Sequence, residues 1–168
     1  MSGKKEKRGQ AGWESSPAGK VFPAVETLLR PVWYIGDRQG EEAVEDFLDW
    51  WGKELSEELR DMGVRDHFEL ANWFAVRERQ LYGTDVEVDG TDVSSTVTVR
   101  KCPRLACALE WKERARSNSP ARAITRKDYC RICTTVYLMS PAQGLGFGHQ
   151  FEFTKTGCVQ AFHEKMRE

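Results

Sequence analysis

The sequence predicts an α+β fold: a helical N-terminal half, then an antiparallel sheet built from two hairpins, with helices packed on one face. Apolar residues recur every three or four positions before Gly83, as in amphipathic helices. Directly after Gly83, valines alternate with polar residues, as in half-buried strands. A length of 168 residues suits one domain. We therefore expect a single domain over 21–168, with a helical part (21–83) and a cysteine-bearing sheet–helix part (84–168).

The segment 1–20 is predicted to be a flexible basic tail. Gly, Ser, Lys and Glu dominate it, and apolar residues show no periodicity. Its lysines and Arg8 would suit an acidic partner, whereas a solvated tail is the simpler interpretation.

Two helices are expected after this tail. The first is short and ends near Leu29, because Pro31 follows it, and an extended stretch leads on to Gly36. The second runs from Glu41 to about residue 62. Acidic residues fill its first turns, where the helix dipole favours them.

A third helix is marked by signals at both of its ends. Asp66 is a suitable N-cap, with Glu69 as its capping-box partner, and the helix runs to about Leu81. Gly83 is a suitable stop.

Two hairpins and two helices follow. Residues 85–89 and 93–101 alternate like strands around the turn signal Asp89-Gly90, and 147–154 and 158–163 do the same around 155–157. Between the hairpins we expect a helix over about 104–116, another over about 121–139, and a mobile loop over 140–148. Four residues of the third strand share one face: Phe147, His149, Phe151 and Phe153.

Composition narrows the class of protein. The formal net charge is -1 and hydrophobic residues make up 40% of the chain, so neither disorder nor a nucleic-acid partner is expected. No apolar run approaches the roughly 18 residues of a membrane span, and no secretory leader follows the basic start. The cytoplasm is the expected location.

The cysteines carry the strongest functional signal. The chain has five, all between residues 102 and 158, and they are Cys102, Cys107, Cys130, Cys133 and Cys158. An odd, one-sided set does not suit a secreted disulfide framework. Metal ligands, a reactive thiol and inert core residues are the three interpretations.

Metal ligation is the interpretation we favour. Cys130 and Cys133 lie three apart, so a helix places both on one face, and this is also a common zinc and iron–sulfur ligand spacing. Cys102 follows a strand and Cys158 begins one, so the sheet could bring both toward that helix. Four thiolates would close a tetrahedral zinc or iron–sulfur site, and three would leave an open position.

An enzyme is the alternative from a different class. A cysteine nucleophile, Cys130 or Cys158, would act with His149 as general base, because a thiol needs a neighbouring base or a lowered pKa. His149 could equally be a satisfied structural histidine or a replacement metal ligand.

Four further residues are candidate ligand-binding groups. Arg100, Arg104 and Arg126 surround the cysteine segments and would bind a carboxylate or phosphate, and Trp111 would line a pocket. A solvated rim of arginines is the competing interpretation.

The order of motifs in the C-terminal part resembles a known group of domains. Three stretches carry the resemblance: Cys102-Pro103, the helix motif ending at Cys130-Arg131-Ile132-Cys133, and the hairpin with Gly157-Cys158. Over residues 84–165 it resembles the 4-vinyl reductase domain and the 2-amino-thiazoline-4-carboxylate hydrolase-like family. The resemblance implies a small-ligand-binding α+β domain, often dimeric, with cysteines near a small-molecule or metal site. In the hydrolase-like branch it implies opening of a sulfur- and nitrogen-containing ring.

This chain departs from the hydrolase-like branch at one position. It has Cys133 where that branch is expected to have an Asp, which favours thiolate ligation over hydrolysis.

The sequence therefore predicts a metal-binding or small-ligand-binding domain with a cysteine-lined site. Two alternatives stay open, a cysteine-dependent hydrolase and a non-catalytic accessory subunit that docks through the helix beginning at Glu41. The expected partners are a small-molecule ligand and a second copy or partner subunit.

Overall fold

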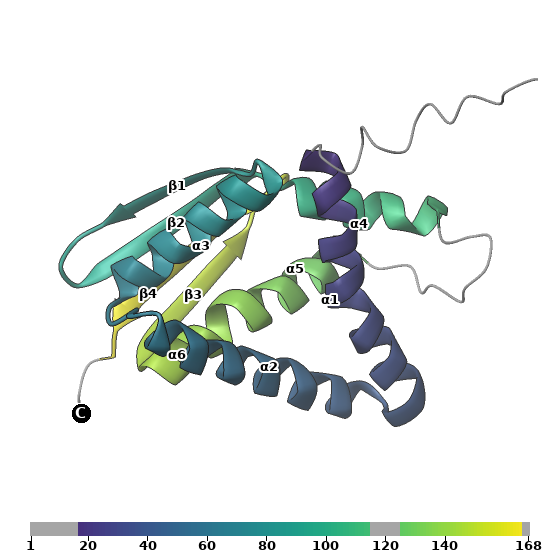
Figure 1. Ribbon diagram of the computed structural model, residues 1–168, viewed down its shortest axis with the longest axis horizontal. Coiled ribbons are helices and arrows are strands. Elements are labelled where there is room, and N and C mark those ends of the chain that lie inside the picture. The colour runs from purple at the N-terminus through teal and green to yellow at the C-terminus, as the bar shows by residue number, and fades with distance from the viewer. Residues whose placement is uncertain (1–16, 115–124, 166–168) are drawn as a thin grey trace, which may run out of the picture.

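The computed structural model describes the backbone of residues 17–114 and 125–165, and side chains within 21–110 and 125–165. It confirms the α+β fold, with helices first and one antiparallel sheet after them (Figure 1). The described elements are α1 (Pro17–Gln39), α2 (Glu41–Asp61), α3 (His67–Tyr82), β1 (Asp85–Gly90), β2 (Ser94–Lys101), α4 (Pro103–Arg114), α5 (Arg126–Thr134), the π-helix η2 (Thr135–Met139), α6 (Ser140–Leu145), β3 (Phe147–Phe153) and β4 (Cys158–Glu164).

Helix α1 corrects the prediction of a short first helix. It continues through Pro23 and Pro31 to Gln39, where the sequence predicted an end near Leu29. A proline inside a helix removes one backbone hydrogen bond. Buried residues spaced by three or four continue across Pro31, from Val21 to Val32, so tertiary packing holds the helix together. Because α1 begins at Pro17, the predicted tail is shortened, and its residues 1–16 lie outside the described residues.

The ends of α3 follow the expected chemistry. The Asp66 side chain accepts a hydrogen bond from the Glu69 backbone N–H at 2.7 Å. The Glu69 carboxylate accepts from the backbone N–H of Arg65, one residue earlier than a capping box would place it. Gly83 ends the helix with a left-handed φ of 65°, which favours glycine.

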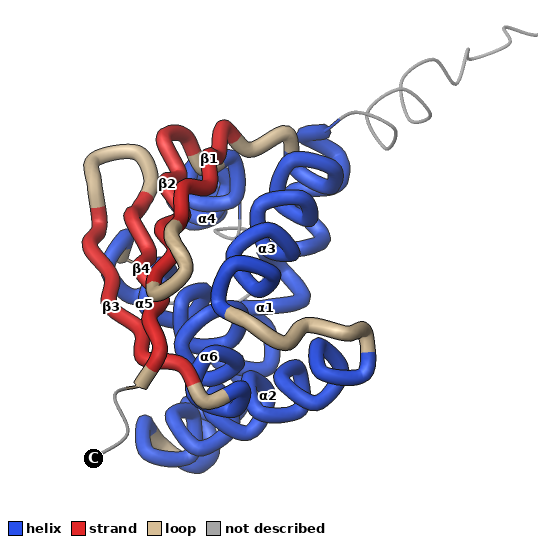
Figure 2. The backbone as a smooth tube through the Cα atoms, turned by 90° about the vertical axis from the view of Figure 1, so that its left-hand side faces the viewer, coloured by secondary structure: helices blue, strands red, loops and turns tan. Residues whose placement is uncertain are grey.

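The four strands form one sheet in the order β1-β2-β4-β3, and every neighbouring pair is antiparallel. Strand β4 therefore joins the two hairpins, with Val99 of β2 opposite Cys158. Figure 2 shows the sheet at one side of the molecule, with helices packed against one of its two faces.

The segment before β3 differs from the prediction of one helix and a mobile loop. Helix α5 begins at Arg126 behind the N-cap Thr125, whose side chain and that of Asp128 form a capping box. The helix then passes into the wider turn of the π-helix η2, and α6 follows directly. Residues 140–145 are therefore helical, where a loop was predicted. Pro141 is compatible with this because it lies at the start of the helix, and it is buried. Residues 115–124, which span the end of one predicted helix, the connection after it and the start of the next helix, lie outside the described residues.

Two groups of buried side chains form the core. One lies between α1, α2, α4 and α5, and the other between α3, α6 and the inner face of the sheet. Cys102 and Tyr137 pack against both groups, so the cysteine-bearing segments lie where the two groups meet.

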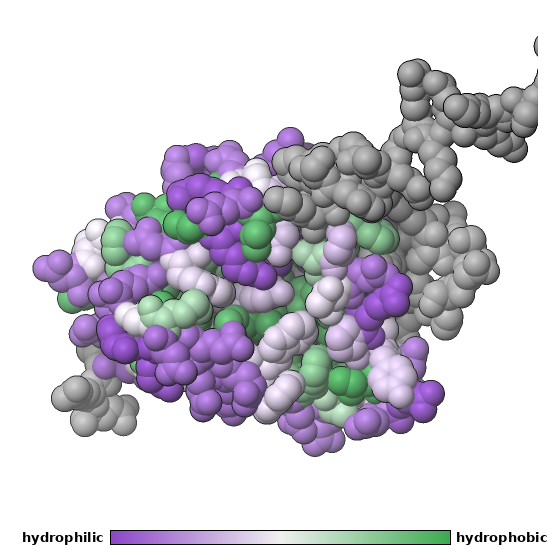
Figure 3. Space-filling model, in the orientation of Figure 1, coloured by the Kyte–Doolittle hydropathy of each residue, from purple (hydrophilic) through white to green (hydrophobic). Residues whose placement is uncertain are grey.

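The face of the molecule shown in Figure 3 is largely hydrophilic, and apolar residues reach it near the junction of α1 and α2. Trp50 of α2 is 56% exposed and Tyr34 of α1 is 59% exposed. Within the described residues, no helix combines the length and the apolar character that crossing a membrane would require.

Candidate functional site

A small internal cavity of about 30 Å³ lies between α3, α4, α5 and the sheet. A cavity must offer at least about 10–15 Å³ to hold one water molecule, so this space admits only a few water-sized groups. Its lining joins segments far apart in the chain, and it is made by Phe74, Glu78, Val99, Cys102, Arg104, Leu105, Tyr129, Cys130, Cys133, Thr134, Leu138, Gly157, Cys158 and Gln160.

All four cysteines predicted as metal ligands line this cavity. Cys102 sits between β2 and α4, and the Leu105 backbone N–H donates to its sulfur at 3.4 Å. Cys130 and Cys133 project from the capped helix α5. Cys158 begins β4, after a turn joined to β2 by a hydrogen bond from the Cys102 backbone N–H to the Thr156 carbonyl at 3.0 Å.

The four thiols do not stand in a coordinating arrangement. Among the described residues, no three His, Cys, Asp or Glu side chains lie close enough together to hold one metal ion. The donor atoms suit zinc or an iron–sulfur cluster, so coordination would require the sulfurs to move toward the ion.

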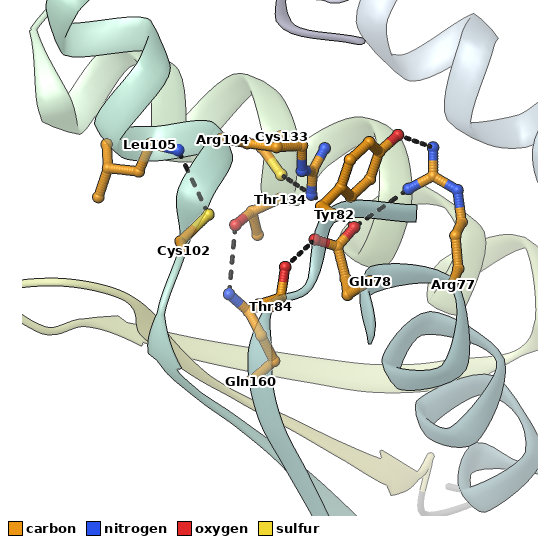
Figure 4. A network of polar contacts seen from close by, with 10 residues as sticks. All are labelled: Arg77, Glu78, Tyr82, Thr84, Cys102, Arg104, Leu105, Cys133, Thr134 and Gln160. Carbon is orange, nitrogen blue, oxygen red and sulfur yellow. Dashed lines mark hydrogen bonds and ion pairs between the residues drawn. The ribbon is translucent and has the colours of Figure 1, made fainter. Parts of the chain in front are cut away.

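A fully buried arginine occupies one side of the cavity. Arg104 is 2% exposed. Its Nη2 lies 2.8 Å from the Glu78 carboxylate and donates to the Cys133 sulfur at 3.2 Å (Figure 4). Burial alone would lower the pKa of Arg104, but Cys133 and Glu78 outweigh it and raise that pKa well above its usual value. The cation is therefore permanent.

Glu78 is the only cavity-lining residue among the described ones with a carboxylate, and both of its oxygens are used. Oε1 is shared between Arg104 and Arg77, the latter at 3.2 Å, and Oε2 accepts from the Thr84 hydroxyl at 3.2 Å (Figure 4). The Arg77 guanidinium also lies 4.3 Å from the ring centre of Tyr137. The buried network thus holds two guanidinium groups on one carboxylate.

Burial keeps the thiols protonated. It raises the pKa of Cys133 to about 12 and that of Cys158 to about 11, and it raises the pKa values of Cys102 and Cys130 as well. The nearby Arg104 acts in the opposite direction at each sulfur. In this arrangement the cysteines are neutral near pH 7 and weakly nucleophilic.

His149 does not line the cavity, but it contacts Gln160, which does. Its Nε2 is 2.9 Å from the Gln160 side-chain oxygen, and the Gln160 amide donates to the Thr134 hydroxyl at 3.3 Å. Burial lowers the pKa of His149, so the ring is neutral near pH 7.

The predicted ligand-binding residues divide into two groups. Arg104 lines the cavity, and Arg126, at the start of α5, adjoins Cys130 and opposes the rise of that thiol's pKa. Arg100 is exposed, pairs with Glu87 and Asp85, and does not line the cavity. The side chain of Trp111 lies outside the described residues.

Several buried polar atoms next to the thiols have no hydrogen-bond partner in the described part of the chain. They are Nε of Arg104, Nε and Nη2 of Arg126, and the hydroxyl of Tyr129. Buried polar groups are nearly always paired. Two of the four donors belong to Arg104 and Tyr129, which line the cavity, and the other two belong to Arg126, which does not.

The chain matches none of the family models, curated proteins or solved structures with which it was compared. The resemblance to the 4-vinyl reductase and hydrolase-like domains stays a prediction.

A second hollow lies away from this chemistry. It is an open groove of about 690 Å³ along the outer side of α3, between residues such as Met62, Trp73 and Leu81. It contains none of the residues predicted as site residues, so the smaller cavity is the candidate site.

Sequence reasoning missed Glu78, Tyr129 and Gln160. Glu78 had a detectable signal, since it lies four residues after the core residue Phe74 on the same face of α3. A carboxylate on an apolar helix face predicts a buried partner. Tyr129 and Gln160 carry no such signal in the sequence.

Proposed function

We propose that this domain binds a thiophilic metal ion, of which zinc is the simplest example, between Cys102, Cys130, Cys133 and Cys158. The observation that carries the proposal is that these four thiols, from three separate stretches of the chain, line one internal cavity. Cysteines buried only as small hydrophobic residues have no reason to gather around a buried arginine.

The charges around the cavity suit thiolate ligands. Arg104 and Glu78 are the two charged residues that line the cavity within the described chain, while Arg77 also pairs with Glu78 and Arg126 adjoins Cys130 just outside the lining. Four thiolates around a divalent ion carry two negative charges. The arginines beside the thiols would offset part of that negative charge.

The size of the cavity favours a single ion over a cluster. A space that admits only a few water-sized groups fits one ion once the sulfurs turn toward it, whereas an iron–sulfur cluster adds several atoms. The raised thiol pKa values make metal binding dependent on proton release, because cysteine ligands bind as thiolates.

The hydrolase alternative has less support. A cysteine nucleophile needs a thiolate or an adjacent base, yet burial raises the pKa of both Cys130 and Cys158. The Gln160 side chain separates His149 from the cavity. The zinc or iron–sulfur hypothesis thus explains more of the arrangement than general-base catalysis does.

The test is metal content after anaerobic purification, measured on the wild type and on a Cys133→Ser, Cys158→Ser double variant. We expect about one zinc per wild-type chain, as in a structural thiolate site, and less than a tenth of that in the double variant. Cys107→Ser is the matched control, because Cys107 does not line the cavity, and it should keep the metal.

Two results would contradict the proposal. One is a wild-type chain that carries no metal and takes up neither zinc nor iron under reducing conditions. The other is equal metal content in the wild type and the double variant, which would place the metal elsewhere in the chain.

A further inference from the structure

The two edge strands of the sheet differ in how well they are protected. The strand order makes β1 and β3 the edges, and an edge strand leaves alternate backbone N–H and C=O groups without a partner in the sheet. The register of β1 is irregular between Asp85 and Val86, and the Arg79 guanidinium donates to the Val86 carbonyl at 2.7 and 3.1 Å. Glu87 and Asp89 add further charge to this strand. Charges and an irregular register keep an edge strand from pairing with another chain.

Strand β3 is far less protected. Its seven residues, Phe147–Phe153, pair with β4 in unbroken register. It contains one charged residue, Glu152, and neither lysine nor proline. Phe151 is 45% exposed, and its ring lies 4.9 Å from that of Phe153. Figure 2 shows β3 at the outer edge of the sheet, so its outward backbone groups and an exposed aromatic ring are placed for the addition of another strand.

The sequence of β3 is complementary to itself when two copies run antiparallel. Pairing over all seven residues puts the two-fold axis at Gln150. Phe147 of one copy then lies opposite Phe153 of the other. His149 lies opposite Phe151 in the same way, on the same face of the sheet. Aromatic pairs directly across antiparallel strands are stabilising.

The other face of the same pairing is complementary in charge. Glu152 of one copy lies opposite Gly148 of the other, so like charges do not meet. Within each chain Gly148 pairs with His163 of β4, and a side chain at Gly148 would overlap the Nε2 of His163. An imidazole nitrogen therefore lies over Gly148, where the carboxylate of the second copy arrives. The two-fold axis repeats this contact, so the interface contains it twice.

We propose that β3 is the surface at which a second copy of this chain binds, antiparallel and in the register centred on Gln150. The two four-stranded sheets then form one continuous sheet. Backbone hydrogen bonds between the two β3 strands supply the attraction, and the contact between Glu152 and His163 fixes the register. No residue of β3 lines the cysteine-bearing cavity, so this interface does not depend on the proposed metal.

Sedimentation equilibrium of the reduced full chain, over a range of protein concentrations, measures the association. We expect a monomer–dimer equilibrium. Phe151→Lys should weaken the dimer by about tenfold or more, because a lysine within an edge strand opposes pairing. Glu87→Lys, on the β1 edge, is the matched control and should keep the wild-type dissociation constant. Circular dichroism checks that both variants are folded, and their metal content should equal that of the wild type.

Charge reversal tests the register. Glu152→Lys should weaken the dimer about tenfold, because it removes both carboxylates from the interface and places a cation against His163. The double variant Glu152→Lys, His163→Glu should recover most of the association. Within one chain, Glu152 lies opposite Val159, and His163 is four residues farther along β4, about 13 Å away. Recovery in the double variant can therefore come only from contact between copies.

Three results would overturn the inference. One is a chain that stays monomeric at every concentration. Another is wild-type association in Phe151→Lys, which would place the interface on a different surface. The third is a double variant that associates no better than Glu152→Lys, which would exclude the register centred on Gln150.

Discussion

Arg104 joins the carboxylate of Glu78 to the thiol of Cys133 at the edge of the cavity. It also lies over the rings of Tyr82 and Tyr137 at 5.0 and 5.2 Å. Because the charge of the Arg104 guanidinium is buried, the folded protein depends on the Glu78 carboxylate to compensate it.

We expect Glu78→Gln to lower the unfolding free energy by about 3–5 kcal/mol, the usual cost of removing one partner from a buried ion pair. The reason is that Arg104 would keep its charge without a counter-ion. Urea denaturation measures the change. Glu87→Gln, which breaks the exposed pair with Arg100, is the control and should have little effect. A loss below about 1 kcal/mol in Glu78→Gln would show that Arg104 is balanced by other groups.

The lowered pKa of His149 predicts how the unfolding free energy changes at acidic pH. Burial lowers its pKa below the usual value of 6.5, so the unfolded chain takes up a proton first as the pH falls. The stability that His149 contributes is complete above about pH 6.5 and is lost as the pH falls through the lower folded-state pKa. His149→Asn should therefore lose less unfolding free energy than the wild type between pH 7 and pH 5, measured by urea denaturation. Parallel pH profiles for the two proteins would rule this explanation out.

At the scale of elements, the turn between β3 and β4 positions Cys158. The Thr154 backbone N–H donates to the Gly157 carbonyl, and the Gly157 N–H donates to the Thr154 hydroxyl, both at 3.1 Å. The turn also packs against β2 so closely that a side chain at Gly157 would overlap the Val99 carbonyl oxygen.

We expect Gly157→Ala to destabilise the protein by about 1–3 kcal/mol, as overpacking does. We also expect a lower metal content, because the displaced turn would move Cys158 away from the position of Cys102. Thermal unfolding and metal analysis measure the two effects. Gly36→Ala, where the added methyl meets only a Val44 methyl at 3.3 Å, is the control. Wild-type metal content in a folded Gly157→Ala protein would show that the turn does not position Cys158.

Local patterns predicted some elements well and others poorly. The alternating valines and the Asp66 and Gly83 signals predicted β2 and α3, because strand alternation and helix caps depend on neighbouring residues. Helix α1 runs on past Pro31 because of packing against α2 and α4, which involves distant residues. The same holds for η2, whose wide turn has no sequence signature.

For the site, the sequence identified the thiols but could not give their surroundings. The spacing of Cys130 and Cys133 and the strand-end positions of Cys102 and Cys158 indicated how the four could be brought together. The Glu78 partner of Arg104 and the distance of His149 from the cavity depend on how α3 and β4 pack. No pattern within either segment contains that information.

At the scale of the whole molecule, the cavity lies where the two groups of core side chains meet. Ligand binding there would connect the helical part to the sheet, so it should stabilise both together. The exposed Trp50 on α2 is compatible with the accessory-subunit hypothesis. Docking through this helix, like the homodimer, stays a prediction.

X-ray absorption at the zinc edge of the zinc-loaded full chain tests the central claim most directly, because it identifies the atoms around the metal. The account predicts a shell of sulfur neighbours at about 2.3 Å, weakened in the Cys133→Ser, Cys158→Ser double variant and unchanged in Cys107→Ser. A shell of nitrogen and oxygen alone at about 2.0–2.1 Å would contradict it, because the cysteine-lined cavity would then not be the metal site.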